Sequence, residues 1–538
     1  MSLPKIYTAT ADANGNAVLH IDDLGLYQIN ASIDDGINTA ISETVQVDVL
    51  ENRTTQSINL PFAKISIKTV QGTVITATNG TDSFTFTAAS NNPTVVHVNL
   101  GNWIVSTTFD GVTKSKTVSV ESYQEYSVVL LPVEVITRTM DFQANTSTLN
   151  TSKGMIEYMF PFIGRRRCNV ADDGTINAWY GDANYTEDGS NGQVMVYQPK
   201  FWYKTTPITL DGVKIRKASW SIADQATNGF KLHPAFYDED GNEVDYILIG
   251  AFKGCLYDTS ASTYDTTDSI THSYKVGTGD KLSSIADVKP VSGYYHSSFT
   301  RANCKITAEN RGAGWHPNNI RVASLNQMMM IVEYGGNMQT LVGRGVVDLS
   351  SGSYNGSSIT GSTYDIGNGT GRAASTKNST SGTGSKTLYN VDGKTSVCYR
   401  GMEDPWGNIY EFIDGINMYG YQPYIATDYN WSESKSTDNY VSCGFTVPSS
   451  GYISAFGYNE TFDWLFIGAE SSGTASNMIG DYQVISSSQS GYHIAVLSGH
   501  WGNGSDAGAF YWSPGFSVST SSRTIGARTT YVPQTHRS

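Results

Sequence analysis

The sequence predicts a mainly β protein with a minor α+β part. The chain of 538 residues contains 33 tyrosines and 53 glycines, and only 16% of its residues are charged. Aromatic and β-branched residues favour strands, whereas Gly, Ser and Asn favour the turns that join them. Residues 63–70 and 83–87 alternate apolar and polar side chains with the period of half-buried strands. Only one stretch has clear helical periodicity, so few helices are expected.

The first 135 residues contain a repeated pattern. VLHI at 18–21 is matched by VVHV at 95–98, LGLY at 24–27 by LGNW at 100–103, and TVQV at 44–47 by TVSV at 117–120. The constant order indicates a tandem duplication of one small all-β module. We expect two immunoglobulin-like β-sandwich modules, 1–62 and 63–135, that serve as spacers or docking units.

Residues 136–538 form the expected large domain, with one predicted helix. Ser324 and Gln327 have the spacing of a capping box. Apolar residues at 325, 328, 329 and 332 then share one helical face, and Gly335-Gly336 provides a C-cap. The pattern predicts an amphipathic helix packed on a sheet.

Three further segments of this domain have simple interpretations. Residues 350–388 are almost all Gly, Ser, Thr and Asn, a composition that predicts a long surface loop or insertion. The basic cluster at 165–167 is interpreted as a solvated strand edge or a subunit contact. The acidic run at 238–242 lies between two apolar runs and predicts a hairpin turn.

Charge and cysteine usage exclude several classes of partner. The net charge is −14, whereas nucleic-acid binding needs a basic face, so no nucleic-acid partner is expected. No window has 18 apolar residues, and we expect no membrane insertion. The start lacks the apolar region of an export signal. The five cysteines lie at least 45 residues apart, which favours synthesis in a reducing cytoplasm over a disulfide framework or zinc pattern.

The common catalytic motifs are absent from the sequence. The two closest of the nine histidines are seven residues apart, and H-E-x-x-H, C-x-x-C and G-x-S-x-G do not occur. We therefore expect no enzyme activity, no cofactor and no metal site.

The C-terminal 140 residues carry three motifs in a fixed order. They are GNIYEF at 407–412, SGHW at 498–501 and GAR at 526–528. This series resembles the C-type-lectin-like fold in its formylglycine-generating-enzyme branch, over about 395–531 and more weakly over 155–345. We expect Asn408 and Glu411 to be buried hydrogen-bonding groups. The chain departs from those enzymes because it has no cysteine after Cys443. The residues taken as the fold motif are Trp406, Gly407, Asn408, Glu411, Phe412 and Arg528.

The resemblance implies a binding surface. The same branch includes phage receptor-binding tail proteins and the variable proteins of diversity-generating retroelements, which display changeable side chains on a stiff scaffold. Aromatic rings among Ser, Asn and Gly are typical of such surfaces. The predicted receptor-binding residues are Tyr482, Tyr492, His493, Ser498, His500, Trp501, Asn503, Ser505, Asp506, Phe510, Tyr511 and Trp512.

The resulting expectation is a phage virion protein of a tail tip or fibre, made in the host cytoplasm. Its C-terminal domain would attach to a host-cell surface receptor, a protein or a glycan, and its N-terminal modules would bind other virion proteins. A homotrimer is implied by the resembled tail proteins. The alternatives are a capsid decoration fibre, a bacterial surface adhesin, and an enzyme of the formylglycine-generating type or a glycan hydrolase.

Overall fold

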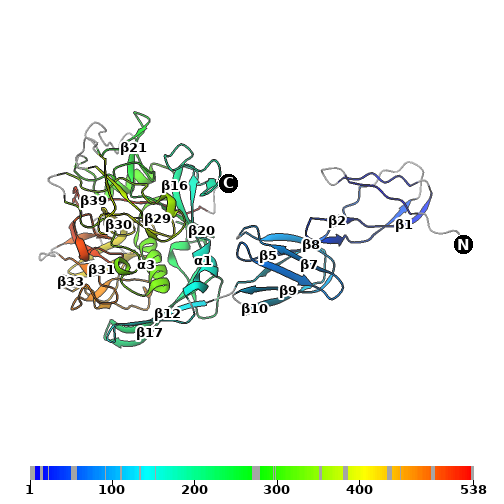
Figure 1. Cartoon of the computed structure of the whole chain (residues 1–538), viewed down its shortest axis with the longest axis horizontal. Coiled ribbons are helices and arrows are strands. Elements are labelled where there is room, and N and C mark those ends of the chain that lie inside the picture. The colour runs from blue at the N-terminus through cyan, green and yellow to red at the C-terminus, as the bar shows by residue number, and fades with distance from the viewer. Residues whose placement is uncertain are drawn as a thin grey trace. The chain divides into compact units, whose positions relative to one another are not determined.

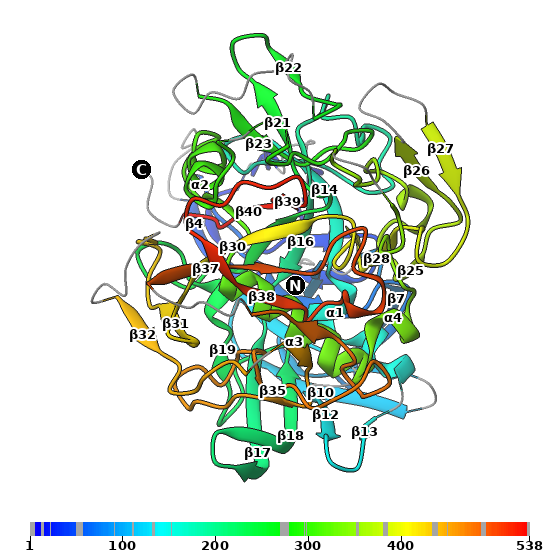
Figure 2. The ribbon, with the colours of Figure 1, turned by 90° about the vertical axis from the view of Figure 1, so that its left-hand side faces the viewer.

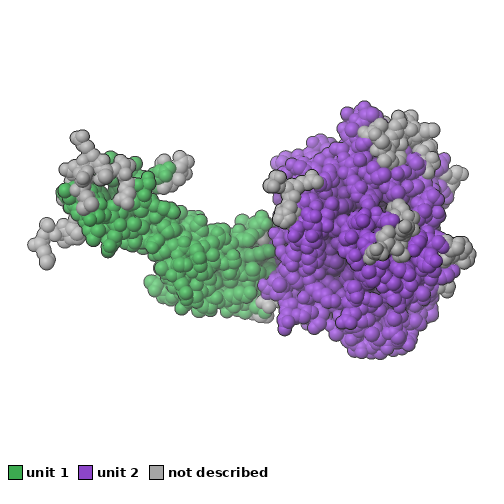
Figure 3. Space-filling view, turned by 180° about the vertical axis from the view of Figure 1, so that it is seen from behind, with its two compact units in different colours: residues 1–132 green, residues 133–538 purple. Residues whose placement is uncertain are grey.

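The computed structural model of this chain is mainly β, with 39% of residues in strands and 10% in helices. The predicted class is confirmed at this level. The chain divides into two compact units, Met1–Pro132 and Val133–Ser538, which Figure 3 colours separately. The structure describes residues 6–11, 16–21, 23–49, 57–90, 92–109, 112–131, 135–151, 153–268, 279–294, 296, 298–350, 354–379, 386–432, 439–448, 450–485 and 491–534.

The first strands of the N-terminal unit form two short antiparallel pairs. β1 (Gly25–Ile29) pairs with β4 (Val45–Val49), and β2 (Ser32–Asp34) pairs with β3 (Thr39–Ile41). Ala40 and Val47 are the buried hydrophobic side chains among the described residues up to 49. This pairing therefore encloses little apolar surface of its own.

The rest of the N-terminal unit consists of a four-stranded and a three-stranded sheet (Figure 1). Their inner faces share a core that includes Trp103, whose indole N–H donates to the carbonyl of Asn99 at 2.8 Å. The Leu-Gly pair that recurs in the sequence marks the start of β1 and of β9. Gly25 and Gly101, the first residues of these strands, both have a positive φ, of 148° and 142°. The sheets are β10 (Val112–Val120), β9 (Gly101–Phe109), β6 (Val74–Thr78) and β7 (Ser83–Thr87), and β11 (Glu125–Val129), β5 (Ala63–Lys68) and β8 (Thr94–Val98).

The larger unit begins with a five-stranded and a six-stranded sheet. The last strand of the chain, β40, lies inside the six-stranded sheet between β20 and β24. The five strands in order are β13 (Thr146–Leu149), β12 (Val135–Asp141), β18 (Lys214–Ala223), β17 (Trp202–Asp211) and β19 (Lys231–Leu232). The six are β15 (Ile176–Trp179), β14 (Arg166–Val170), β16 (Gln193–Pro199), β20 (Tyr246–Gly250), β40 (Thr529–Tyr531) and β24 (Trp315–Pro317).

An eight-stranded sheet contains most of the motifs singled out in the sequence. Its order is β32 (Tyr440–Ser442), β31 (Gln422–Ala426), β30 (Tyr410–Tyr419), β37 (Tyr492–Leu497), β38 (Trp512–Ser517), β36 (Tyr482–Gln483) and β33 (Gly451–Tyr452), and β39 (Ile525–Gly526) also pairs with β30. β30 is thus the strand on which all three motif segments meet, because β37 leads into SGHW and β39 into GAR.

Smaller sheets and short helices complete this unit. The sheets are β22 (Thr263–Tyr264), β21 (Cys255–Asp258) and β23 (Lys281–Ser283); β25 (Gly371–Arg372), β28 (Val397–Tyr399) and β29 (Met402–Glu403); β26 (Thr376–Ser379) and β27 (Lys386–Tyr389); and β34 (Ala455–Phe456) and β35 (Gly468–Glu470). The helices are α1 (Phe160–Ile163), α2 (Arg301–Glu309), α3 (Ile320–Tyr334) and α4 (Met338–Leu341), with 3₁₀ turns η1 (Lys153–Tyr158), η2 (Pro234–Phe236), η4 (Tyr364–Ile366) and η5 (Gly504–Asp506). Among the described residues, no helix combines the length and apolar character needed to cross a membrane.

Helix α3 begins earlier than the capping-box pattern predicted. The side chain of Asn319 caps the helix by accepting from the N–H groups of Arg321 and Val322, whereas Ser324 lies within the helix and donates to the Trp464 carbonyl. Gly335 ends the helix in the left-handed region, as predicted. The helix lies beside β12, β18 and β30 in the interior of the larger unit (Figure 2). Residues 320–333 are all buried, so the predicted amphipathic character is wrong.

The basic cluster at 165–167 is mostly buried, contrary to the prediction of a solvated edge. Arg165 and Arg167 are 1% and 0% exposed. Arg167 pairs with Glu187 at 2.8 Å and donates to the carbonyl of Gly401 at 2.7 Å. The guanidinium of Arg166 stacks over Trp179. Partners far away in the sequence make burial of these charges possible.

The Gly/Ser/Thr-rich segment is also partly interior, so the prediction of a surface loop for 350–388 is wrong for residues 355–360, which are buried. Ser358 donates its backbone N–H to Asn408 at 2.6 Å, and Thr360 donates its hydroxyl to the carbonyl of Ile285 at 2.9 Å. Hydrogen bonding, rather than apolar side chains, supports this buried segment. Residues 351–353 and 380–385 lie outside the described residues.

Candidate functional site

The three C-terminal motifs meet at a buried charged centre, which consists of Glu411, Lys253, Arg528, Asn318 and Ser498. Glu411 on β30 accepts from Lys253 at 2.6 Å, from Asn318 at 2.6 Å and from Arg528 at 2.9 Å. Arg528 also donates to the carbonyls of Gly250 and Glu403. Every one of these side chains is buried. Because Glu411 lies on β30 and Arg528 directly precedes β40, the centre joins the eight-stranded sheet to the six-stranded sheet.

The ionisation of this centre follows from burial and charge pairing. Burial alone would raise the pKa of Glu411, but the charges of Arg528 and Lys253 outweigh it and hold that pKa at about 2. Burial lowers the pKa of Lys253 to about 8, against the opposing effect of Glu411. At neutral pH the centre therefore contains a carboxylate between two cations.

The centre is not arranged for nucleophilic catalysis. Ser498 has a strained φ of 85° and its hydroxyl lies 3.2 Å from the Lys253 ammonium. Lys253 also donates to Glu411 and to the carbonyl of Ile409 at 3.0 Å. A protonated lysine has three N–H donors and no lone pair. All three donors of the ammonium form are used, and in this form Lys253 donates to the Ser498 hydroxyl rather than accepting its proton.

The residues of the fold motif support the turns around this centre. Asn408 has a φ of 63°, accepts from the N–H of Ser358 and donates to Asp404 at 2.8 Å. Gly407 has a φ of 75°, and a Cβ there would meet the Val346 carbonyl at 2.8 Å. Asn408 and Glu411 are thus buried and hydrogen-bonded, as predicted. Trp406 and Phe412 are fully buried in the core.

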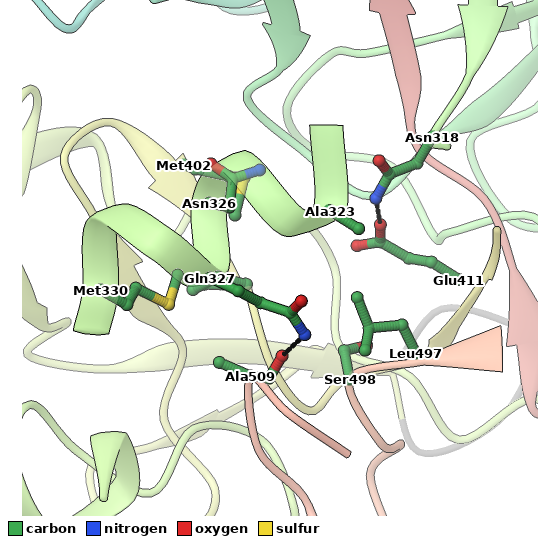
Figure 4. Close-up of a pocket in the computed structure, with 11 residues that line it drawn as sticks. Asn318, Ala323, Asn326, Gln327, Met330, Met402, Glu411, Leu497, Ser498 and Ala509 are labelled. Atoms are coloured by element: carbon green, nitrogen blue, oxygen red, sulfur yellow. Dashed lines mark hydrogen bonds between the residues drawn. The ribbon is translucent and has the colours of Figure 1, made fainter. Parts of the chain in front are cut away.

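A small cavity of about 20 Å³ lies beside the charged centre, between α3 and β30 (Figure 4). The side-chain carbonyl oxygens of Asn326 and Gln327 line it and have no hydrogen-bond partner among the described residues. One water molecule needs about 10–15 Å³ and two or more polar partners. The cavity can hold a single water molecule but no organic substrate.

Five of the twelve predicted receptor-binding residues are buried, and this corrects the prediction for them. Trp501, Phe510, Tyr511 and Trp512 are 1–2% exposed, and Ser498 is 1% exposed. The indole of Trp512 donates to the Phe466 carbonyl at 2.9 Å, and the hydroxyls of Tyr511 and Tyr410 are 2.8 Å apart. These side chains form the core between the sheets and cannot touch a partner.

The other seven predicted residues are at least partly accessible. Ser505 is exposed, and Tyr482, Tyr492, His493, His500, Asn503 and Asp506 have intermediate exposure. They lie at three separate places on the eight-stranded sheet and on the loop that follows β37. This distribution leaves two groups of tyrosines and two half-buried histidines, His493 on β37 and His500 in the loop that follows it.

The first group, here called the tyrosine surface, consists of Tyr452, Tyr482, Ser505 and Asp506. The rings of Tyr452 on β33 and Tyr482 on β36 are 5.0 Å apart in an edge-to-face arrangement. The Tyr452 hydroxyl donates to Asp506 at 2.6 Å and lies 3.3 Å from the Ser505 hydroxyl. Tyr452 was not among the predicted residues, because it lies outside 482–512 and meets the others only through the sheet.

The second group lies at the other end of β37. The rings of Tyr492 and Tyr419 are 4.9 Å apart, and Tyr419 is 47% exposed. His500 instead packs between Tyr410 and Trp501, and burial, with the charge of Arg523, lowers its pKa to about 4. His500 is therefore neutral at physiological pH.

A cluster of possible metal ligands was not predicted from the sequence. Asp265, Asp268 and His296 place one ligand atom each within 4.8 Å of one another, and all three are buried. The two aspartates are three residues apart, but His296 lies 28 positions further on, a spacing that no common metal motif has. Only the folded chain brings the histidine to the carboxylates.

No family model matches the chain, and no curated protein matches it either.

Proposed function

We propose that residues 133–538 form the attachment domain of a phage virion protein, at a tail tip or fibre, that binds a receptor on the host cell. The observation that carries this proposal is the tyrosine surface, where two accessible rings lie beside a hydroxyl and a carboxylate. Tyrosine provides rigid contact area with little loss of side-chain entropy, and small polar groups add adaptable hydrogen bonds.

The charged centre supports the proposal because it keeps the scaffold independent of the surface. Glu411, Lys253 and Arg528 are bonded to each other and to backbone carbonyls rather than to the tyrosine surface. Side chains at the surface can therefore change without breaking the centre. This is the arrangement that a C-type-lectin-like attachment protein would need, as the resemblance of the three motifs suggests.

The N-terminal unit fits a role as spacer and docking unit to other virion proteins. Its two parts would be immunoglobulin-like modules, in agreement with the repeat in the sequence and the paired sheets of residues 63–129. A homotrimer of the chain would present three attachment domains. Several weak sites on one particle raise avidity by about 10²–10⁴.

The test is adsorption of the purified full-length protein to a broad panel of bacterial strains. The triple variant Tyr452→Ser, Tyr482→Ser, Asp506→Ala is expected to lose at least about tenfold in adsorption to any strain that the unmodified protein binds, because interface tyrosines are frequent hot spots. Its melting temperature should stay within about 4 °C of the original, since the replaced side chains lie at the surface.

Tyr364→Ser is the matched control, because Tyr364 is 50% exposed and packs against another tyrosine, Tyr180. It should adsorb like the unmodified protein. Equal adsorption of the triple variant would overturn the tyrosine surface as the binding site. Binding to no strain would favour a capsid decoration fibre, and release of sugars from host glycan would favour a hydrolase.

A further inference from the structure

A second buried cluster in the larger unit has the composition of a metal site. Asp265 follows β22, Asp268 lies three residues further on, and His296 precedes α2. The three residues are 3%, 2% and 4% exposed. They belong neither to the charged centre nor to the tyrosine surface, so neither of those sites accounts for them.

Two distances in the cluster are close to those between neighbouring ligands of a shared cation. His296 Nε2 lies 3.1 Å from Asp265 Oδ2 and 3.5 Å from Asp268 Oδ1. Bonds of about 2.0–2.2 Å from a tetrahedral ion to nitrogen and oxygen ligands place neighbouring ligand atoms about 3.3–3.6 Å apart. A small adjustment of Asp265 would complete three sides of such a site. The imidazole edge faces both carboxylates.

The charges in the cluster also favour a divalent cation. Two carboxyl groups are buried here beside one imidazole, and uncompensated buried charge is costly. The nearby Lys289 donates its ammonium to the carbonyl of Ser357 at 2.8 Å. A divalent cation would bring two positive charges to these two carboxyl groups directly.

Neighbouring groups hold the carboxylates in place, as outer-shell groups do in metal sites. Ser292 donates its backbone N–H and its hydroxyl to Asp268 at 3.1 and 2.6 Å, and Asn355 donates its amide to Asp268 at 2.8 Å. The Thr267 N–H donates to Asp265 at 3.2 Å. The Ser357 hydroxyl, two residues from Asn355 and fully buried, has no hydrogen-bond partner among the described residues.

We propose that Asp265, Asp268 and His296 bind one divalent transition-metal cation of the Zn²⁺ or Mn²⁺ class. A nitrogen ligand together with two carboxylates favours these ions over Ca²⁺, which prefers sites made of oxygen alone. The ion would tie the segment after β22 to the segment before α2 and, through Asn355, to the buried part of the Gly/Ser/Thr-rich segment.

Metal content of the full-length protein tests the proposal without any assumption about attachment. The protein is stripped with a chelator, incubated with Zn²⁺, Mn²⁺ or Ca²⁺ alone, passed over a desalting column and analysed for metal. We expect about one equivalent of Zn²⁺ or Mn²⁺ per chain and none of Ca²⁺. If the unmodified protein binds neither Zn²⁺ nor Mn²⁺, the proposal is wrong. No residue has been substituted in this experiment, so misfolding of a variant cannot explain such a result.

Three variants locate the ion by titration calorimetry. His296→Ala should abolish binding, and Asn355→Ala, which removes a support but no ligand, should weaken it about 10–100-fold. His97→Gln is the matched control, since His97 pairs with a single carboxylate, Asp35, at 3.1 Å. Circular dichroism shows whether each variant is folded. Unchanged binding in folded His296→Ala would place the ion elsewhere and refute the assignment.

Discussion

The charged centre and the tyrosine surface are attached to the same eight-stranded sheet but differ in what their side chains can do. Glu411 on β30 has its oxygens bonded to Lys253, Arg528 and Asn318 and is 3% exposed. Tyr482 on β36 keeps intermediate exposure. The motifs that carry the sequence resemblance therefore hold the scaffold together, whereas the accessible side chains of the tyrosine surface belong to none of these motifs.

The largest effect is expected from removing the charge at the centre. Glu411→Gln leaves Lys253 and Arg528 buried without their counter-ion, and breaking a buried ion pair in this way costs about 3–5 kcal/mol. Urea denaturation should show the loss as a lower unfolding midpoint. Asp245→Asn is the control, because Asp245 pairs with Lys200 but is 83% exposed, and such surface pairs contribute about 0–1 kcal/mol. Equal effects of the two substitutions would contradict the comparison.

Acid should weaken the same centre. The pKa of Glu411 is about 2 in the folded protein, against an unperturbed value of 4.5. The carboxylate therefore contributes its full stability above about pH 4.5 and loses it as the pH falls through 2. A shift of this size corresponds to about 3 kcal/mol for this buried group.

The measurement is the difference in unfolding free energy between the original protein and Glu411→Gln, followed from pH 7 to pH 2. The difference should shrink below pH 4.5. Burial raises the pKa values of Glu403 and Asp404, and the charge of Asp404 adds to the rise for Glu403, so these two groups act in the opposite direction in both proteins. A constant difference across the range would show that the charge of Glu411 does not stabilise the fold.

The sequence predicted the buried polar residues of the first motif better than the surface, for a physical reason. Asn408 and Glu411 are polar residues within an apolar run, and such residues are buried only where hydrogen bonds hold them. The end of α3 at Gly335 could also be predicted, because it depends only on residues that are neighbours in the sequence. The predicted start at Ser324 was wrong because α3 is buried all round, so its pattern has no polar face to mark a boundary.

Other errors arose where the partner lies far along the chain. Arg167 is buried because Glu187 and the Gly401 carbonyl accept from it, and residues 355–360 are buried because backbone and amide groups of other segments bond them. Composition reports an average polarity and carries no information about such partners. Trp501 and Trp512 were placed at the surface for the same reason, since a tyrosine- and tryptophan-rich segment has the same composition whether its rings face inward or outward.

The smallest effect on stability is expected from replacing an accessible ring, and its comparison with a buried ring tests whether the two environments differ. Tyr482→Ser should change the unfolding free energy by about 0.5–1 kcal/mol, because the ring only borders the core. Tyr511→Ser should cost about 3 kcal/mol or more, because it opens a cavity in that core and removes one hydrogen-bond partner of the Tyr410 hydroxyl. The two substitutions are chemically identical, so burial alone separates their effects. Comparable unfolding midpoints in urea would mean that both rings face the same environment, and the tyrosine surface would then no longer be distinct from the core.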